Sequence, residues 1–234
     1  MKILTSIVFA VLGMSFCFAD QPMAVDIVDH SKPDAPIRTS GQMQITEKVN
    51  DGQLKVSFAH HFDCANVSNK TIIAFVNVIN YANSYHPLIQ ENQELDAYFF
   101  HELEIAPGKK YSHDHHQVDG EMTGPIREGA KRGSPHAEAE AVFVQFADGS
   151  TWGVVDNEHV RALLNTRNLL LQTLKQLNAA ADKGESDFVS ALKQVLPDER
   201  ADQIIDRIRT QQKENGSPAA IQKIRDMLAV AASR

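Results

Sequence analysis

Residues 139–155 read AEAVFVQFADGSTWGVV, and this stretch decides the fold class that the sequence predicts. Two segments rich in apolar residues, 139–146 and 151–155, lie on either side of Asp148-Gly149. An Asp-Gly pair between two apolar strands is the strongest short-range indication of a β-hairpin, because these residues tolerate the left-handed backbone of a type I′ turn. We therefore predict two antiparallel strands joined by a tight turn.

The sequence before this hairpin has the same β character. Leu54, Val56 and Phe58 alternate with polar or small residues, which is the period of a half-buried strand. Residues 71–81 (TIIAFVNVINY) are rich in β-branched and aromatic residues, as a central strand is, and residues 97–105 form another predicted strand. Short strands joined by turns, with no helical pattern between them, favour an antiparallel β-sandwich over a parallel α/β sheet.

The period of the apolar residues changes at about residue 156. They then recur three and four apart as far as about residue 181, with one interruption near Arg167, which predicts an amphipathic helix. Three more helices follow, with apolar positions at Phe188, Leu192 and Val195, then Ile204, Ile205 and Ile208, then Ile221, Ile224, Met227 and Leu228. Two arrangements stay open: the four helices form their own small bundle, or they lie on the sandwich.

Several of these stretches resemble parts of exported bacterial proteins. The hairpin FVQFADGSTWG (143–153) is similar to one in uncharacterised exported proteins, where it ends a β domain and helices follow. The stretch NVSNKTIIAF (66–75) and the turn Ala106-Pro107-Gly108 resemble small immunoglobulin-like modules of bacterial secreted proteins. The resemblance implies an immunoglobulin-like sandwich, and it brings no catalytic residue with it.

The predicted fold is therefore α+β, an antiparallel, immunoglobulin-like β-sandwich followed by a C-terminal bundle of about four α-helices. The predicted parts are a signal peptide at residues 1–19, an extended lead-in with at most one edge strand at 20–41, the β-sandwich domain at 42–155 and the helical domain at 156–234. The change of period separates the last two parts.

Residues 1–19 have the three parts of a cleavable secretory signal. Lys2 provides a positive start, residues 3–18 are almost entirely apolar, and Cys17 and Ala19 place small residues at the −3 and −1 positions. The apolar run of 16 residues is shorter than the ~20 that cross a bilayer. The alternatives to cleavage are a retained membrane anchor and a lipid attached to Cys17. We predict an exported protein, periplasmic or secreted, with no transmembrane segment after cleavage.

Composition limits the partners of the exported chain. The 234 residues carry a formal charge of −7, and loss of Lys2 makes it −8. A mildly acidic chain is a poor match for nucleic acid or for anionic lipid, which both attract basic surfaces. Cys64 is the only cysteine left after cleavage, so no internal disulfide can form. A buried, apolar role for Cys64 is predicted, with a reactive thiol as the alternative.

The densest group of histidines is His113-Asp114-His115-His116. On a strand, residues two apart share a face, so His113 and His115 would direct two imidazoles toward one ion. Such a pair suits a divalent transition metal, namely zinc, copper, nickel or iron. The candidates for a third ligand are His101, Glu121 and His136. The alternative is a solvated, histidine-rich loop that is partly protonated in mildly acidic surroundings.

The histidine pair is similar to the metal-binding motif of the cupin family, in which a glycine precedes the pair and a glutamate follows it. Here Gly108 lies one residue closer to His113 than the motif requires, and Glu121 lies one residue too far from His115. A second cupin motif with its later histidine is missing from the sequence. The resemblance implies a cupin-like metalloenzyme, and the two departures leave the pair itself as a candidate metal site.

The sequence supports three hypotheses of function, which follow in order of preference. The sequence lacks the G-x-S-x-G elbow, phosphate-binding loops and the zinc motif HExxH. The leading hypothesis is thus a non-catalytic binding or interaction protein, whose helical region docks a protein partner or forms a homo-oligomer. The second is an extracytoplasmic metal-binding protein that uses His113 and His115. A hydrolase with a non-standard site is the third.

Overall fold

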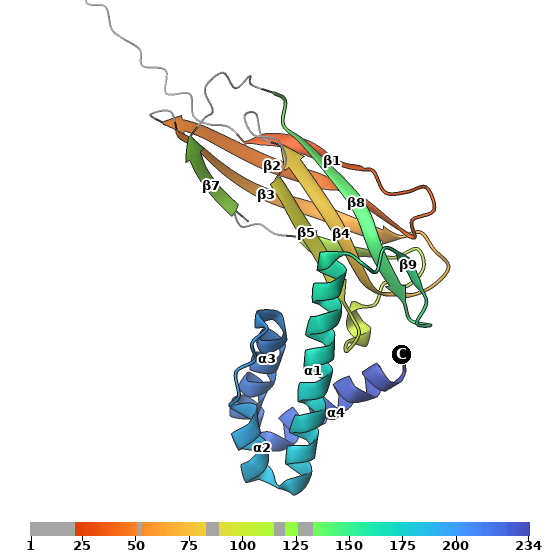
Figure 1. The fold of residues 1–234 in the computed structure, drawn as a ribbon, viewed down its shortest axis with the longest axis vertical. Helices are drawn as coiled ribbons and strands as arrows, with labels where there is room; N and C mark the ends of the chain where they lie inside the picture. The colour runs from red at the N-terminus through yellow and green to blue at the C-terminus, as the bar shows by residue number, and fades with distance from the viewer. Residues whose placement is uncertain (1–21, 51–52, 83–88, 115–119, 126–132) are drawn as a thin grey trace, which may run out of the picture.

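The computed structural model describes residues 22–50, 53–82, 89–114, 120–125 and 133–234. It is α+β, with a curled β-sheet followed by four C-terminal helices (Figure 1). The β domain and the helical C-terminal region that the sequence predicts are therefore confirmed. Within the described ranges, no helix combines the length and the apolarity that crossing a bilayer requires.

The strands form a single mixed sheet. In the described part of the chain it has nine strands: β1 Met23–Asp29, β2 Ile37–Asn50, β3 Gln53–Asn66, β4 Ile72–Ala82, β5 Ile89–Asp96, β6 Lys110–Asp114, β7 Gly120–Pro125, β8 His136–Phe146 and β9 Thr151–Gly153. The order across the sheet is β5-β4-β8-β1-β2-β3-β6, with β7 also on β3 and β9 also on β8. Strands β1 and β8 run parallel, and the other paired strands are antiparallel.

The predicted antiparallel, immunoglobulin-like sandwich is wrong. One sheet curls into a half-barrel and covers its own concave face, so no second sheet is needed to bury the core. Across the inside, the Phe75 ring of β4 lies 5.9 Å from that of Tyr111 on β6, and Gln93 of β5 bonds to His60 of β3. These strands are not neighbours in the sheet, so the contacts show how strongly it curls.

A glycine marks a place where the curl brings two strands unusually close. Gly41 of β2 pairs with Ile27 of β1 on one side and with Phe62 of β3 on the other. A Cβ atom at this position would lie 2.2 Å from the backbone oxygen of His61 and 2.6 Å from the Cα of Phe62. Only glycine fits, which is typical of strongly bent strands. The long β2–β3 pair can therefore follow the curvature of the half-barrel.

Two local predictions in the β domain are also corrected. Strand β1 lies inside the sheet between β8 and β2, although we expected at most an edge strand in the lead-in. Residues 97–105 do not form a strand, because β5 ends at Asp96 and the carboxylate of Asp96 accepts a bond from the Tyr98 amide, 2.9 Å. The chain then turns through a short 3-10 helix, η1 (His101–Leu103). A carboxylate that captures a nearby amide ends a strand in this way.

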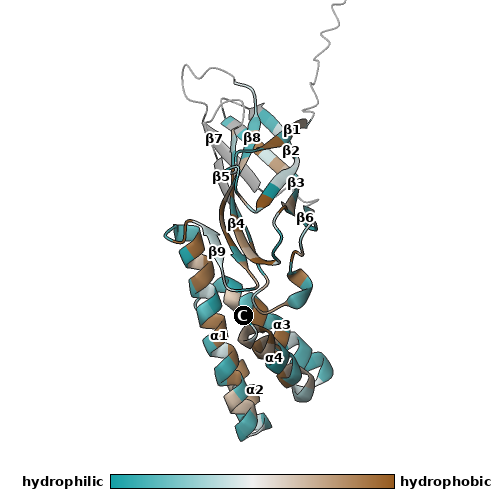
Figure 2. Ribbon diagram, turned by 90° about the vertical axis from the view of Figure 1, so that its right-hand side faces the viewer, coloured by the Kyte–Doolittle hydropathy of each residue, from teal (hydrophilic) through white to brown (hydrophobic). Residues whose placement is uncertain are grey.

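The four helices are α1 (Glu158–Lys183), α2 (Glu185–Leu192), α3 (Glu199–Asn215) and α4 (Ser217–Ala232). They bury an apolar core of their own, which includes Leu174, Phe188, Ile205 and Ile224. In Figure 2 the apolar faces of the helices turn toward one another below the sheet. The prediction for Val195 is wrong: α2 ends at Leu192, and Val195 follows it with 73% of its surface exposed.

A small apolar cluster joins the helices to the sheet. Val76 of β4 and Phe143 of β8 lie on the outer face of the sheet, where Val160 and Leu163 of α1 cover them. Phe99, in the turn after β5, belongs to the core of the helices instead. The structure thus combines the two arrangements that the sequence left open. The helices have their own core, and the first of them also packs on one end of the sheet (Figure 1).

Candidate functional site

The structure places His113 on the inner face of the sheet, against a histidine from another strand. The rings of His113 and His60 are stacked with centroids 5.6 Å apart, and the ring of Phe62 lies 5.1 Å from that of His113. The hydroxyl of Tyr111 lies 3.4 Å from Nδ1 of His113. His60 itself is buried, with 3% of its surface exposed.

The other predicted metal ligands are not brought to His113 by any described contact. His115 lies outside the described residues, as does the side chain of Glu121, whose backbone pairs with Ser57. His101 is exposed on η1, where its Nδ1 lies 2.5 Å from the carboxylate of Glu104. Among the side chains that are described, no group of three histidine, cysteine or acidic residues is placed to hold a metal ion. The metal site stays a prediction.

The contact with His101 belongs to a structural ion-pair cluster. Arg234, at the end of the chain, donates from Nη2 to the same Glu104 carboxylate at 2.5 Å, and the Arg234 side chain is only 6% exposed. Burial opposes the ionisation of Glu104, but the bonds from Arg234 and His101 outweigh it and lower the pKa of the carboxyl. This cluster ties the end of α4 to η1.

Cys64 is buried, as predicted, and its surroundings make it a poor nucleophile. Its Sγ lies 3.2 Å from Nδ2 of Asn77 and 3.8 Å from Oγ1 of Thr39. Burial raises the pKa of the Cys64 thiol to about 12, although the two polar neighbours act in the opposite direction. Because the thiolate is the reactive form, the thiol is inert at neutral pH.

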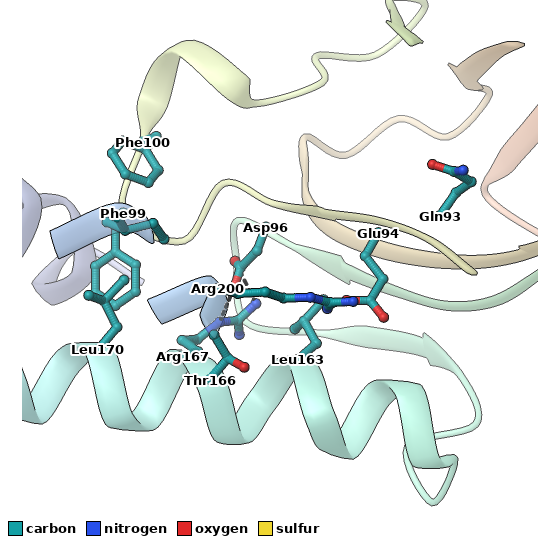
Figure 3. A pocket seen from close by; sticks show the side chains of 11 residues that line it. Gln93, Glu94, Asp96, Phe99, Phe100, Leu163, Thr166, Arg167, Leu170 and Arg200 are labelled. Carbon is teal, nitrogen blue, oxygen red and sulfur yellow. Dashed lines mark hydrogen bonds and ion pairs between the residues drawn. The ribbon is translucent and has the colours of Figure 1, made fainter. Parts of the chain in front are cut away.

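A cavity lies where the sheet meets the helices, and we call it the junction pocket. Its volume is about 350 Å³. The end of β5, the turn after it, α1 and α3 provide its walls (Figure 3). Its lining consists of Gln93, Glu94, Asp96, Phe99, Phe100, Leu163, Thr166, Arg167, Leu170, Arg200 and Ile204. Small-molecule sites favour such places between structural units, with apolar walls and a few fixed polar groups.

Arg167 is the central polar residue of this wall. Its Nε and Nη2 donate to the two carboxylate oxygens of Asp96 at 3.0 and 2.9 Å, and its Nη1 donates to Oε1 of Gln145 at 2.6 Å. The guanidinium also lies over the ring of Tyr98, 4.4 Å from the centroid. Only 6% of the arginine side chain is exposed. A buried guanidinium is tolerated here because its fork is matched by a bidentate carboxylate.

The register of the sheet explains why these partners meet. Ala74 of β4 pairs with Asp96 of β5 on one side and with Gln145 of β8 on the other. The two polar side chains therefore stand in one row across three strands, with a small residue between them. Glu94 lies two residues before Asp96 on β5, so the two side chains share a face of the strand. Figure 3 shows Asp96 directed at Arg167 and Glu94 directed at Arg200.

A second ion pair at the pocket differs from the first in its exposure. Arg200 of α3 bonds to the carboxylate of Glu94, which is 10% exposed, while the arginine side chain is 59% exposed. The hydroxyl of Thr166 donates to the carboxylate of Asp198 at 2.8 Å, and Asp198 also caps α3 by accepting from the Ala201 amide. Another cation can therefore replace Arg200 beside Glu94, whereas Thr166 and Asp198 hold α1 and α3 together.

The junction pocket combines paired charges with an apolar surface. Its acidic and basic groups neutralise one another in pairs, and its Thr166 hydroxyl is already a donor to Asp198. The described residues that line it include no histidine, cysteine or serine. Phe99, Phe100 and the aliphatic side chains provide an apolar surface beside the charges. The arrangement suits a ligand with both apolar and polar parts.

Comparison with known proteins gives no family. The sequence matches no protein-family model, and no curated protein is similar to it at a significant level. The case for a site therefore rests on geometry. Sequence reasoning did not find the junction pocket, although one signal was visible: Arg167 interrupts the apolar stripe of α1, and a charged residue within such a stripe has to meet a partner.

We predict that Arg167→Met lowers the free energy of unfolding by about 2–4 kcal/mol, because it leaves Asp96 and Gln145 without their shared donor. Urea titration followed by circular dichroism measures the change. Arg161→Met is the matched control, since its ion pair with Asp156 is exposed and contributes less than about 1 kcal/mol. Equal effects of the two substitutions would contradict a structural role for Arg167.

Proposed function

We propose that this chain is an exported, non-catalytic binding protein and that its ligand occupies the junction pocket. The observation that carries the proposal is the composition of the pocket walls. A nearly buried carboxylate, Glu94, faces an exposed arginine, Arg200, beside an apolar surface that includes Phe99 and Phe100. Three separate segments of the chain build this cavity, whose volume of about 350 Å³ is within the usual range for small-molecule sites.

The Glu94–Arg200 pair supports a binding role because its arginine is exposed while its carboxylate is not. A buried carboxylate keeps a cationic partner, so a cationic ligand group can take the place of Arg200 beside Glu94. The Arg167–Asp96 pair beside it is bidentate and largely shielded from water, and it keeps the wall in place. A preorganised wall next to an exchangeable pair is what a selective binding site requires.

Export rests on the residues of the N-terminal signal. We predict that the full chain, expressed in a bacterial host with a secretory pathway, yields a product that begins at Asp20 and lies outside the cytoplasm. Cell fractionation and intact mass measure this outcome. Ala19→Lys should block cleavage, because the −1 position needs a small residue, while Asp20→Asn should leave cleavage unchanged. A cytoplasmic product that begins at Met1 would refute export.

Ligand binding is tested with a compound library of apolar, cationic, anionic and zwitterionic fragments. We predict that some fragments raise the melting temperature of the chain starting at Asp20, and that Ile204→Trp abolishes the shift because the indole fills the pocket. Val195→Trp, at an exposed position outside the junction pocket, is the matched control. If no fragment distinguishes the two variants, the junction pocket is not the ligand site.

Metal binding is the second candidate, and the contact between His113 and His60 favours it. The ring of His60 stacks on that of His113, so His60 adds a third imidazole to the predicted pair of His113 and His115. We predict near-stoichiometric zinc, copper, nickel or iron in untagged protein, lost in His113→Ala and reduced in His60→Gln. Elemental analysis measures it, with the exposed His30→Ala as control. Trace metal in the unsubstituted chain would rule this function out.

A further inference from the structure

A second cavity adjoins the junction pocket on the far side of Phe100. Its volume is about 220 Å³, and η1, α3 and α4 form its walls. Phe100 and Ile204 line both cavities, so the two share a wall beside α3. We call it the α3–α4 cavity.

The interior of the α3–α4 cavity is apolar. Ile208 and Met227, which are each 2% exposed, line it together with the half-buried Phe100. Leu103 of η1 lines it as well and leaves 40% of its surface in solvent. An exposed leucine beside a concave apolar surface is a place where an apolar ligand gains free energy by displacing water.

The charged groups around this apolar interior are mostly positive. Arg207 is exposed and forms no ion pair with any described residue, and Nζ of Lys223 lies 5.6 Å from the centroid of the Phe100 ring. Glu102 is the one acidic residue in the described lining. The cavity therefore has a net positive charge in a protein whose total charge is −7. Positively charged side chains beside an apolar cavity, in a protein that is acidic overall, favour a negatively charged ligand.

We propose that the α3–α4 cavity binds a small amphipathic anion. Its apolar group lies against Phe100, Leu103 and Met227, and its anionic group lies at the rim with Arg207 and Lys223. The proposal rests on the proposed binding function and deepens it, since it gives the class of ligand that the neighbouring cavity takes. Arg207 supplies a planar donor fork for a carboxylate, and Lys223 supplies a point charge.

Calorimetric titration with octanoate tests the proposal, with octanamide as the neutral ligand of the same shape. We expect octanoate to bind more tightly than octanamide, and Arg207→Gln and Lys223→Gln each to weaken octanoate binding about two- to fivefold. Neither substitution should change the affinity for octanamide. Lys175→Gln is the matched control, since this exposed lysine of α1 lines neither cavity and its loss removes the same charge.

The apolar part is tested by Leu103→Ser, which should weaken octanoate and octanamide by a similar factor. Circular dichroism of each variant verifies the fold, and the substituted positions are solvent-accessible, so the fold should be retained. Equal affinities for the two ligands, or equal losses in Lys175→Gln and Arg207→Gln, would overturn the proposal. If octanoate does not bind while other fragments bind the junction pocket, the proposed ligand class of the α3–α4 cavity is wrong, and the proposed binding function is unaffected.

Discussion

The buried guanidinium of Arg167 is the constraint on which the arrangement of the two parts depends. The sheet and the helices have separate apolar cores, and among the described residues they are joined by a small cluster around Val76 and Leu163 and by Phe99. Apolar contacts of that size tolerate sliding, because they have no direction. A bidentate pair with Asp96 and a third bond to Gln145 do have direction, so they set where α1 meets the sheet.

The junction pocket follows from that placement. Once α1 is held at the end of β5, α3 comes next to it through the bond from Thr166 to Asp198. The turn after β5 then stands between the sheet and α3, with Phe99 in the core of the helices and Phe100 in both cavities. Polar bonds thus position α1 and α3, while Phe99 holds the turn through the apolar core of the helices.

Local patterns predicted the elements well, and long-range pairing explains what they missed. The change of period at residue 156 identified the helical region, and Asp148-Gly149 identified the turn between β8 and β9, because both signals depend on neighbouring residues. A period of two indicates that one face of a strand is buried, but it says nothing about what covers that face. The parallel pairing of β1 with β8 joins residues more than 100 positions apart, so no local pattern distinguishes a curled sheet from a sandwich.

The candidate site likewise shows that local patterns identify single residues but not their distant partners. It also links ligand binding to the packing of the helices on the sheet. The sequence drew attention to His113, but its partner His60 became visible only through the pairing of β3 with β6. The walls of the junction pocket likewise come from three segments that are far apart in the sequence. A ligand that binds the assembled junction therefore stabilises it, by about 2.7 kcal/mol at a hundred times its dissociation constant. The ligand and the Arg167 pair then stabilise the same contact between sheet and helices, so a variant that weakens this contact also lowers the affinity for the ligand.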